Sequence, residues 1–455
     1  MADITAAARL GNFAADCATC EISSENMNNA AFCLLDALGL ALLARAEPTV
    51  AAMTSLAPDG VGPGSAQLWT DGRHSGVAAA IEVNATAVHG HFHDDSDYAS
   101  WSHPGSLIVP PALSLADAAG ADIDTALRGI IAGYAAVDWL GAGEVVARAL
   151  ISRGIRTSPT LGTIGAAAAG ATVLNLNPAQ AGHAIGIATS ITGGLLEPVR
   201  VGSDEWRVQN AHAARGGIMA AQLAARGVLG ASTALEGPKG LLPSYTGMTS
   251  PPEHWSREPV PDAVVRAVAK PYATLGDNMS AAIAAKLLHE DGVDHRKIRA
   301  IRLTLWRPYS EYPGTDFRGP FDRTAQAMAS TVFAVGAMLS LGRLDYAVNS
   351  DMRSDPDILR LASIATIEPD DVGNAEDSLI ELTLSDGSTV RRHSREAPRT
   401  LLYHDRSYAQ KLFADRAEKS GHDRVRAEAL TAAIFERIDG GPPQTATDLL
   451  RAFFG

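Results

Sequence analysis

Residues 157–196 read TSPTLGTIGAAAAGATVLNLNPAQAGHAIGIATSITGGLL and contain no Asp, Glu, Lys or Arg. A long uncharged stretch is typical either of a buried core or of a membrane span. Asn175, Asn177 and Pro178 divide this one into two pieces that are too short and too polar to cross a bilayer. The stretch therefore predicts two fully buried helices, and we expect no insertion into a membrane.

The composition of the whole chain sets limits on size and on partners. At 455 residues it exceeds one ordinary domain, so two or three are expected. Hydrophobic residues make up 46% and charged residues only 20%, which favours a large buried core. The formal net charge of -13 argues against nucleic acid as a partner but leaves a small anionic substrate open. Three cysteines are too few for a disulfide framework, and the N-terminus lacks the pattern of an export signal, so a cytoplasmic protein is expected.

Residues 5–265 have the patterns of helices throughout and show no strand-like alternation. Ser158-Pro159 and Asn177-Pro178 each place a capping side chain before a proline, which indicates a helix start. The helices predicted in this half cover residues 29–46, 104–119, 124–150, from 158 through the alanine run at 166–169, 178 to about 193, and 211–227.

The pattern changes to mixed helix and strand near residues 259–271. Residues 298–306, IRAIRLTLW, alternate polar and apolar side chains as a half-buried strand does. Further strands are predicted at 364–367 and 379–384, followed by a hairpin through Asp386-Gly387. The helices predicted here cover residues 324–341, 408–419, 424–438 and a short segment from Thr445. These patterns predict a mainly α fold with a smaller α+β part: a helical domain at 1–265, an inserted α+β domain at 266–398, and C-terminal helices at 399–455 that return to the first domain.

Residues 89–103 concentrate titratable side chains just before an apolar helix. His89, His91, His93 and His103 lie here, with Asp94 among them. An imidazole changes charge near neutral pH, and a neighbouring carboxylate tunes that change, so the segment favours proton transfer. Two other interpretations stay open: a polar surface loop that only caps the next helix, or a metal site made of His89, His91 and His93.

Positively charged side chains stand beside several predicted helix starts. Arg153 and Arg156 precede Ser158, and Arg200 and Arg207 precede the helix at 211–227. Lys270 lies where the two predicted domains meet. Because the helix N-terminus also attracts anions, these residues are candidates for holding a carboxylate substrate.

Segments spread along most of the chain resemble the 2-methylcitrate dehydratase family, also called MmgE/PrpD. Its members include cis-aconitate decarboxylases and iminodisuccinate epimerases. The segments are LLDALGLAL at 34–42, HGHFHDDSDYASWSHPGSLIVPPALSLAD at 89–117, SPTLGTIGAAAAGATVLNL at 158–176, AGHAIGIATSITGGLLE at 181–197, AARGGIMAAQLAARG at 213–227 and LEGPKGLL at 235–242. The resemblance implies a helical domain with an α+β lid domain, a homodimer, and no metal or other cofactor.

The family's functional positions match this chain only in part. The matches are His89, Asp94, Asp95, His103-Pro104 and Lys270-Pro271, with Ser96 in place of a threonine. An aspartate of the family's histidine segment falls on Phe92, a later histidine falls on Arg156, and a lysine falls on Trp206. The Cys and His that follow Lys-Pro in the family are absent from residues 273–280, ATLGDNMS. Since Phe92 cannot move a proton and Arg156 stays charged, the proton-transfer residues are expected to differ from those of the family.

Together these observations predict a cytoplasmic, cofactor-independent lyase or isomerase that acts on a small polycarboxylate, as a dehydratase, decarboxylase or epimerase does. The catalytic candidates are His103, His93, His91, Asp94 and Lys270. The substrate-binding candidates are Arg156, Arg207, His89, Asp95, Ser96 and Tyr272, and no metal ligand is assigned. The expected partners are a small carboxylate and a second copy of the chain, without nucleic acid or membrane. Two alternatives remain: a metal-dependent enzyme using His89, His91 and His93, and a non-catalytic relative that only binds carboxylates.

Overall fold

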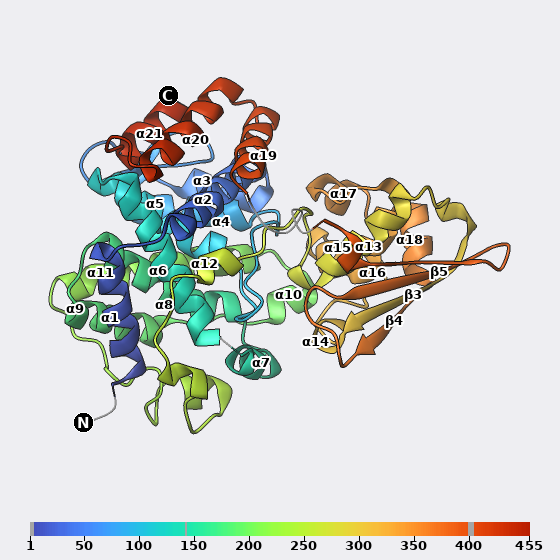
Figure 1. Ribbon diagram of the computed structural model, residues 1–455, viewed down its shortest axis with the longest axis horizontal. Coiled ribbons are helices and arrows are strands. Elements are labelled where there is room, and N and C mark those ends of the chain that lie inside the picture. Colours follow the sequence, from blue (N-terminus) through green and yellow to red (C-terminus); the bar gives the residue numbers. More distant parts are fainter. Residues whose placement is uncertain (1–3, 142, 399–404) are drawn as a thin grey trace.

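The computed structural model describes residues 4–141, 143–398 and 405–455. It consists of a large helical body and a smaller α+β unit beside it (Figure 1). The predicted fold class, mainly α with a smaller α+β part, is confirmed. We call these two parts the helical body and the α+β unit.

The helical body is formed by both ends of the chain. Its N-terminal helices are α1 (Ala6–Thr19), α2 (Ser24–Ala44), α3 (Pro48–Leu56), α4 (Val77–His89), α5 (Pro104–Ala119), α6 (Ile123–Gly141), α7 (Val145–Ser152), α8 (Thr157–Val173), α9 (Pro178–Ile191), α10 (Glu197–Val201), α11 (Trp206–Ala225) and α12 (Ala263–Arg266). The C-terminal helices are α19 (Arg406–Lys419), α20 (Arg424–Ile438) and α21 (Ala446–Phe454).

The uncharged helix α8 lies in the centre of the body and packs against α5, α6 and α11. Close approach of α6 and α8 depends on glycine. A Cβ atom at Gly165 would lie 2.5 Å from the side chain of Val137 and 3.0 Å from the carbonyl oxygen of Gly133. Helix α8 is buried almost throughout, as predicted. The second predicted helix, α9, is only half-buried, since both of its ends are exposed.

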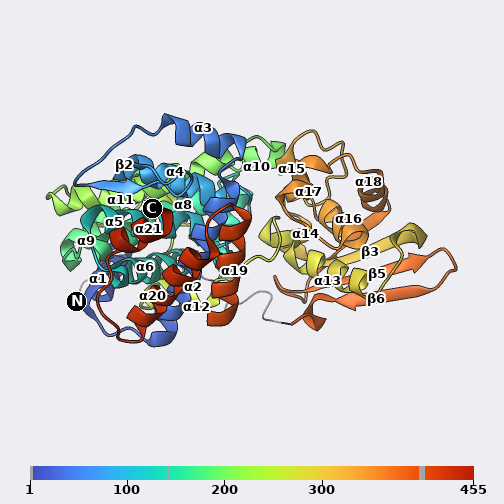
Figure 2. The same ribbon diagram turned by 90° about the horizontal axis from the view of Figure 1, so that it is seen from above.

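The C-terminal helices complete the core of the body. Figure 2 shows α19 and α20 beside α2, while α21 packs against α20 and α5. Phe413 of α19 and Phe435 of α20 belong to the same hydrophobic cluster as Leu38 of α2. A buried ion pair between Arg416 Nη1 and Asp36 Oδ1, 2.7 Å long, fastens α19 to α2. The last part of the chain thus returns to the first, as the sequence predicted.

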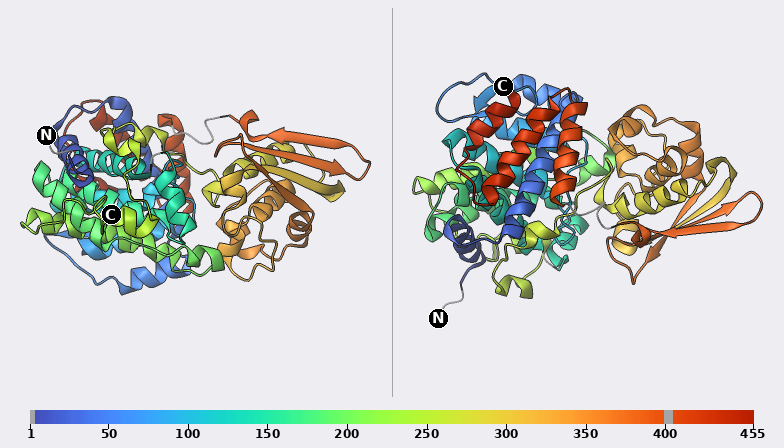
Figure 3. Two further views of the ribbon diagram at one scale, coloured as in Figure 1. Left: turned by 90° about the horizontal axis from the view of Figure 1, so that it is seen from below. Right: turned by 45° about the horizontal axis from the view of Figure 1, so that its top comes forward.

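The α+β unit has its own core around a four-stranded sheet. The strands β3 (Ile298–Trp306), β4 (Ala365–Asp370), β5 (Ser378–Leu384) and β6 (Thr389–His393) are ordered β4-β3-β5-β6, with only the β3–β4 pair parallel. In β3 the buried residues Ile301, Leu303 and Leu305 alternate with more exposed ones, which explains the pattern in the sequence. The helices of the unit are α13 (Met279–Glu290), α14 (Arg307–Ser310), α15 (Thr324–Ala329), α16 (Thr331–Leu341), α17 (Tyr346–Asp351) and α18 (Pro356–Ser363); Figure 3 shows them together with the sheet from two further sides.

Several predicted elements differ from those observed. The helix predicted at 124–150 is two helices, α6 and α7, because Gly143 and Glu144 adopt positive φ. The helix predicted at 324–341 is interrupted at Ser330, which caps α16. Ser158 does not cap α8: the helix begins at Thr157 after Arg156. The sequence also missed a short hairpin, β1 (Ser65–Gln67) with β2 (His74–Gly76), whose strands are too short to show alternation.

One described helix, α2, is long and apolar enough to cross a membrane. In its most apolar window 83% of the residues are buried inside the protein, which is what a core helix of this length shows. The predicted domain boundaries stay a prediction, and the one between 398 and 399 adjoins residues 399–404, which lie outside the described residues.

Candidate active site

Three loop segments meet where the helical body adjoins the α+β unit: residues 90–103, 267–278 and 306–312. The first two are joined by a pair of backbone hydrogen bonds, in which Ser96 and Val268 each donate to the other over 2.9 Å. This bridge brings the histidine segment next to Lys270. The histidine segment and the junction segment are therefore neighbours in space, as a shared site requires.

His103 precedes α5 and has one ring nitrogen engaged and the other free. Its Nδ1–H donates to the carbonyl oxygen of Asp95 over 2.9 Å, with the hydroxyl of Ser96 at 3.4 Å from the same nitrogen. No described residue forms a hydrogen bond with Nε2. Burial lowers the pKa of His103 well below its ordinary value, and the charge of Lys270 lowers it further. The ring is therefore neutral at physiological pH, with an unprotonated Nε2 that can accept a proton.

A pocket beside His103 admits the centre of a water molecule over about 30 Å³, and about 350 Å³ of space lies between its walls when the open mouth is included. It lies between the helical body and the α+β unit. Its lining residues are Ser96, Asp97, Tyr98, Trp101, Ser102, His103, Leu275, Gly276, Asp277, Tyr309 and Tyr312. We call it the His103 pocket. Its walls are aromatic and polar, and its described lining contains no Lys or Arg.

Asp277 is a further titratable group of the His103 pocket, and it was not predicted from the sequence. It lies on the single turn Gly276–Asn278, just before α13. Burial raises its pKa from 3.8 to about 7, although the charge of Lys270 acts in the opposite direction. The Asp277 charge in turn raises the pKa values of Tyr309 and Tyr312, after the larger effect of burial. A carboxyl group with a pKa near neutrality is suited to giving a proton.

His89, at the end of α4, links a buried carboxylate to a buried guanidinium. Its Nδ1 lies 2.8 Å from Asp94 Oδ2, and its Nε2 lies 2.7 Å from Arg156 Nη2. Since Arg156 can only donate, Nδ1 carries the proton and donates to Asp94. Burial lowers the pKa of His89 to about 4, so the ring stays neutral between the two charges. For Asp94, burial would raise the pKa, but the hydrogen bond from His89 and the charge of Lys270 keep it below the ordinary value.

Asp95 points away from the His103 pocket and caps α5. Its Oδ1 accepts from the backbone N–H of Gly105 over 2.7 Å, and its Oδ2 accepts from the hydroxyl of Tyr134 over 2.6 Å. Burial raises the pKa of Asp95 to about 7. Asp95, which the sequence suggested for substrate binding, thus caps α5, and Asp94, a catalytic candidate, orients the imidazole of His89.

The three predicted cations are near the site, and each of them donates to groups of the protein. Arg156 Nη1 donates to the carbonyl oxygen of Trp206 over 2.6 Å and to Gln209 over 3.1 Å. Lys270 Nζ donates to the carbonyl oxygens of Phe92 and Thr274, over 2.7 and 3.1 Å. None of these residues lines the His103 pocket. Backbone oxygens accept hydrogen bonds from Arg156 and Lys270 behind the pocket wall, and the expectation that these cations clamp a carboxylate stays a prediction.

Arg207 is likewise held within the helical body. Its guanidinium donates to the carbonyl oxygen of Gly90 over 2.9 Å and pairs with Asp204 at 2.9 Å and Glu47 at 3.4 Å. It also lies over the ring of Trp206, 4.2 Å from the ring centre. Only 1% of its side chain is exposed, and each nitrogen of the guanidinium faces a group of the protein.

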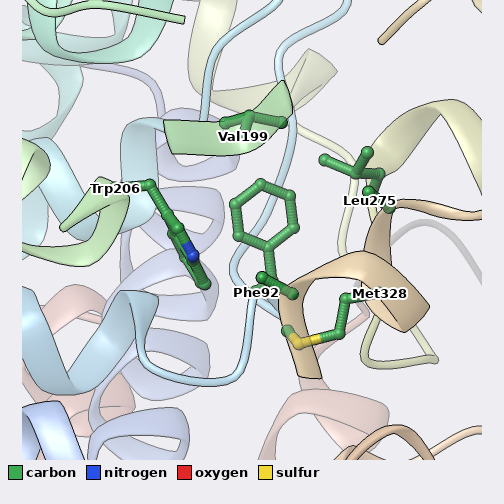
Figure 4. A pocket seen from close by; sticks show the side chains of 7 residues that line it. Phe92, Val199, Trp206, Leu275 and Met328 are labelled. Atoms are coloured by element: carbon green, nitrogen blue, oxygen red, sulfur yellow. The ribbon is translucent and has the colours of Figure 1, made fainter. Parts of the chain in front are cut away.

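An apolar cluster occupies the space between His103 and these cations. Its central contact is an edge-to-face pair of Phe92 and Trp206, with ring centres 4.4 Å apart. Figure 4 shows Leu275 and Met328 of the junction and the α+β unit facing Phe92 from the other side. We call Phe92, Trp206, Leu275 and Met328 the apolar plug. Phe92, Trp206 and the segment 273–280, which contains Leu275, depart from the family pattern at places far apart in sequence. The fold brings them together in the apolar plug.

The other predicted residues lie outside the His103 pocket. His91 stacks on Tyr346 of α17, with ring centres 3.9 Å apart, and burial lowers its pKa to about 3. His93 Nε2 is buried without a partner, and burial also lowers the pKa of this ring. Tyr272 packs against the core of the α+β unit. Neither His91 nor His93 lines the pocket, whereas Asp277 does; the catalytic roles predicted for the two histidines stay predictions.

The arrangement of the histidines also bears on the alternative of a metal site. Both ring nitrogens of His89 are engaged, and His91 faces Tyr346. Across residues 4–141, 143–398 and 405–455, no three His, Cys, Asp or Glu side chains are grouped so that they could hold a metal ion. The spacing His89-x-His91-x-His93 therefore does not produce converging ligands.

The chain combines a helical body and an α+β unit, with a histidine segment at their junction. This arrangement defines a class of protein, and similarity to known proteins identifies the class. The family model described as the MmgE/PrpD N-terminal domain matches residues 8–254, more than half of the chain. The chain belongs to the MmgE/PrpD family. It is also 26% identical over 339 residues to the cis-aconitate decarboxylase-like protein oryM of Aspergillus oryzae. The aligned residues cover 72% of this chain and 67% of that protein. Both matches support an enzyme of the dehydratase or decarboxylase type.

The sequence analysis missed Asp277, Tyr309 and Tyr312. Tyr309 and Tyr312 lie on and just after α14, more than 200 residues from His103. The signal available was the isolated Asp277 in a segment otherwise without charge, ATLGDNMS, directly after Lys270-Pro271. A single acid in an apolar segment that leads into a buried helix is a candidate for a perturbed pKa.

Proposed function

We propose that the chain is a cofactor-independent lyase or isomerase that moves a proton at a carbon next to a carboxyl or carbonyl group of a small organic acid. The observation that carries this proposal is His103: its Nδ1–H is held by the Asp95 carbonyl oxygen, and its Nε2 is free at the wall of a pocket. A fixed tautomer and a neutral ring are what a general base needs.

In this proposal His103 and Asp277 share the proton transfers. The C–H bond of the substrate breaks, its electron pair stays on the carbon, and Nε2 of His103 takes the proton. In a dehydration, Asp277 gives its proton to the departing hydroxyl group, which leaves as water. The hydroxyl groups of Tyr309 and Tyr312 can donate to the charge that develops on the substrate carboxyl or carbonyl oxygen, because burial keeps both phenols protonated by raising their pKa values.

Asp94, His89 and Arg156 lie outside the His103 pocket and are linked by hydrogen bonds. Their chain of hydrogen bonds ends at the carbonyl oxygen of Trp206, and the ring of His89 lies 5.5 Å from that of His103. Because this series of hydrogen bonds is fully buried and reaches the starts of α8 and α11, it fixes the histidine segment against both helices. We assign these three residues positioning roles.

A substrate screen with paired variants tests the proposal. The panel contains aconitate, 2-methylcitrate, citrate and iminodisuccinate, extended by monocarboxylic hydroxy and amino acids. We expect turnover of at least one acid and a loss of about 100-fold or more in kcat in His103→Gln. His212→Gln, on the exposed side of α11, serves as the matched control. Unchanged kcat in His103→Gln would contradict the proposal, and binding without turnover of any acid would favour the non-catalytic alternative.

A further inference from the structure

We propose that the apolar plug restricts the His103 pocket to acids with a single carboxylate and an apolar remainder. The inference rests on the proposed function for treating the ligand as a substrate. It goes beyond it by naming a substrate class and the residues that select it: Phe92, Trp206, Leu275 and Met328.

The plug leaves almost no space of its own. Its four side chains are between 1% and 5% exposed. The gap among them allows the centre of a water molecule only about 10 Å³, which is room for one water. A substrate carboxylate cannot enter this space without displacing a ring.

The plug also separates the His103 pocket from the buried cations. Lys270 Nζ lies 5.1 Å from the centre of the Phe92 ring, and the Arg156 guanidinium lies 6.0 Å from that of Trp206. Both cations donate to backbone carbonyl oxygens, as described above. A second carboxylate on the substrate would therefore be buried without a free cation, and an unpaired buried charge is strongly unfavourable.

The titratable groups that face the pocket supply no positive charge for a second carboxylate. Asp97 and Asp277 both line it, while its described lining holds no Lys or Arg. Leu275 lines the His103 pocket and the plug at once, and Tyr98 and Trp101 add aromatic surface. A ligand with one carboxylate, hydrogen-bonded by hydroxyl groups, and an apolar remainder against Leu275 fits these walls.

The backbone conformation of Phe92, the central residue of the apolar plug, is unfavourable for an aromatic residue. Phe92 has a φ of 53°, a region that Gly, Asn and Asp adopt far more readily than a bulky side chain. Its N–H donates to the carbonyl oxygen of His89 over 3.0 Å, and its own carbonyl oxygen accepts from Lys270. The surroundings thus impose this conformation on an aromatic residue, and the ring is directed into the plug.

A comparison of two acids of equal carbon number tests the inference. Butanoate and butanedioate are titrated into the full-length protein, and binding is followed by ligand-observed NMR. The wild type is expected to bind butanoate at least tenfold more tightly than butanedioate. In Phe92→Gly, which accepts the positive φ and removes the ring, the ratio is expected to fall below threefold because Lys270 and Arg156 become accessible.

Two further variants keep the test decisive. Met328→Ala opens the plug from the side of the α+β unit and should also lower the preference for butanoate over butanedioate. It provides the test if Phe92→Gly fails to fold. Phe454→Ala, at the end of α21, removes a ring away from the site and should leave the ratio unchanged.

Three results would overturn the inference: equal or tighter binding of butanedioate by the wild type, a ratio that neither plug variant alters, or no binding of butanoate at all. The proposed function fails by a different result, since it predicts loss of turnover in His103→Gln whatever the charge of the substrate.

Discussion

Arg156 donates a hydrogen bond to Nε2 of His89 over 2.7 Å, and the opposite nitrogen of the same ring donates to Asp94. One neutral imidazole therefore connects a buried cation with a buried anion. Neither ion has to be neutralised by solvent, and both are fixed relative to His103. This relationship explains how a fully buried charge pair persists beneath an apolar plug.

Removing His89 should destabilise the protein strongly. In His89→Leu the carboxylate of Asp94 loses its hydrogen-bond donor and Arg156 loses an acceptor, so we expect a loss of about 3–5 kcal/mol in the free energy of unfolding. Chemical denaturation measures this change. Adding Asp94→Asn to His89→Leu should restore part of the loss, because it removes the unpaired charge. His91→Leu, which breaks only a stacking contact, should cost about 1 kcal/mol; equal losses in His89→Leu and His91→Leu would contradict the account.

The pH dependence of turnover should report the proton on Asp277. With a pKa of about 7, this carboxyl loses its proton as the pH rises through neutrality, so kcat should fall above pH 7. The pKa of His103 is held well below its ordinary value, so no decline is expected between pH 7 and pH 6. Asp277→Asn should lower kcat at neutral pH and remove the alkaline decline. A rate that rises from pH 7 to pH 9 in the wild type would contradict the role of Asp277.

The crossing of α6 and α8 should not tolerate a larger residue. Gly165→Ala places a methyl group 2.5 Å from the side chain of Val137 and 3.0 Å from a backbone oxygen, so a loss of about 1–3 kcal/mol is expected. Gly182→Ala on α9 is the matched control: its methyl group would meet no atom closer than 3.7 Å. This control should be neutral or stabilising by up to about 1 kcal/mol, since alanine favours a helix over glycine. Thermal unfolding of both variants measures the difference, and equal melting temperatures would contradict the packing described.

The regular elements could be predicted well because their signals are local. The alternation in β3 and the cap of α9 at Asn177 depend on residues within a few positions of each other. The misplaced breaks at Gly143-Glu144 and Ser330 have a different origin. There the backbone leaves helical geometry for one or two residues, with positive φ at Gly143 and Glu144 and an extended Ser330 that caps α16, although the apolar pattern on both sides continues as a helix.

The site could be predicted only in outline. The histidine segment indicated His103, and the order of domains indicated a junction, but the direction of a long side chain depends on the whole fold. Arg156 and Lys270 are near helix starts and loops, as expected, yet they turn to backbone oxygens. Phe92 and Trp206 appeared as separate departures from a family pattern, and only the fold shows that they touch each other and lie beside Leu275.

Solvent deuterium exchange into an acid that binds the His103 pocket tests the central claim most directly, because it follows the proton itself. The protein is incubated in D₂O with such an acid, and NMR detects deuterium at the carbon next to the carboxyl or carbonyl group. The account predicts incorporation by the wild type and by His212→Gln, and a loss of at least about 100-fold in His103→Gln. Exchange at an undiminished rate in His103→Gln would show that another group takes the proton, and the account would be wrong.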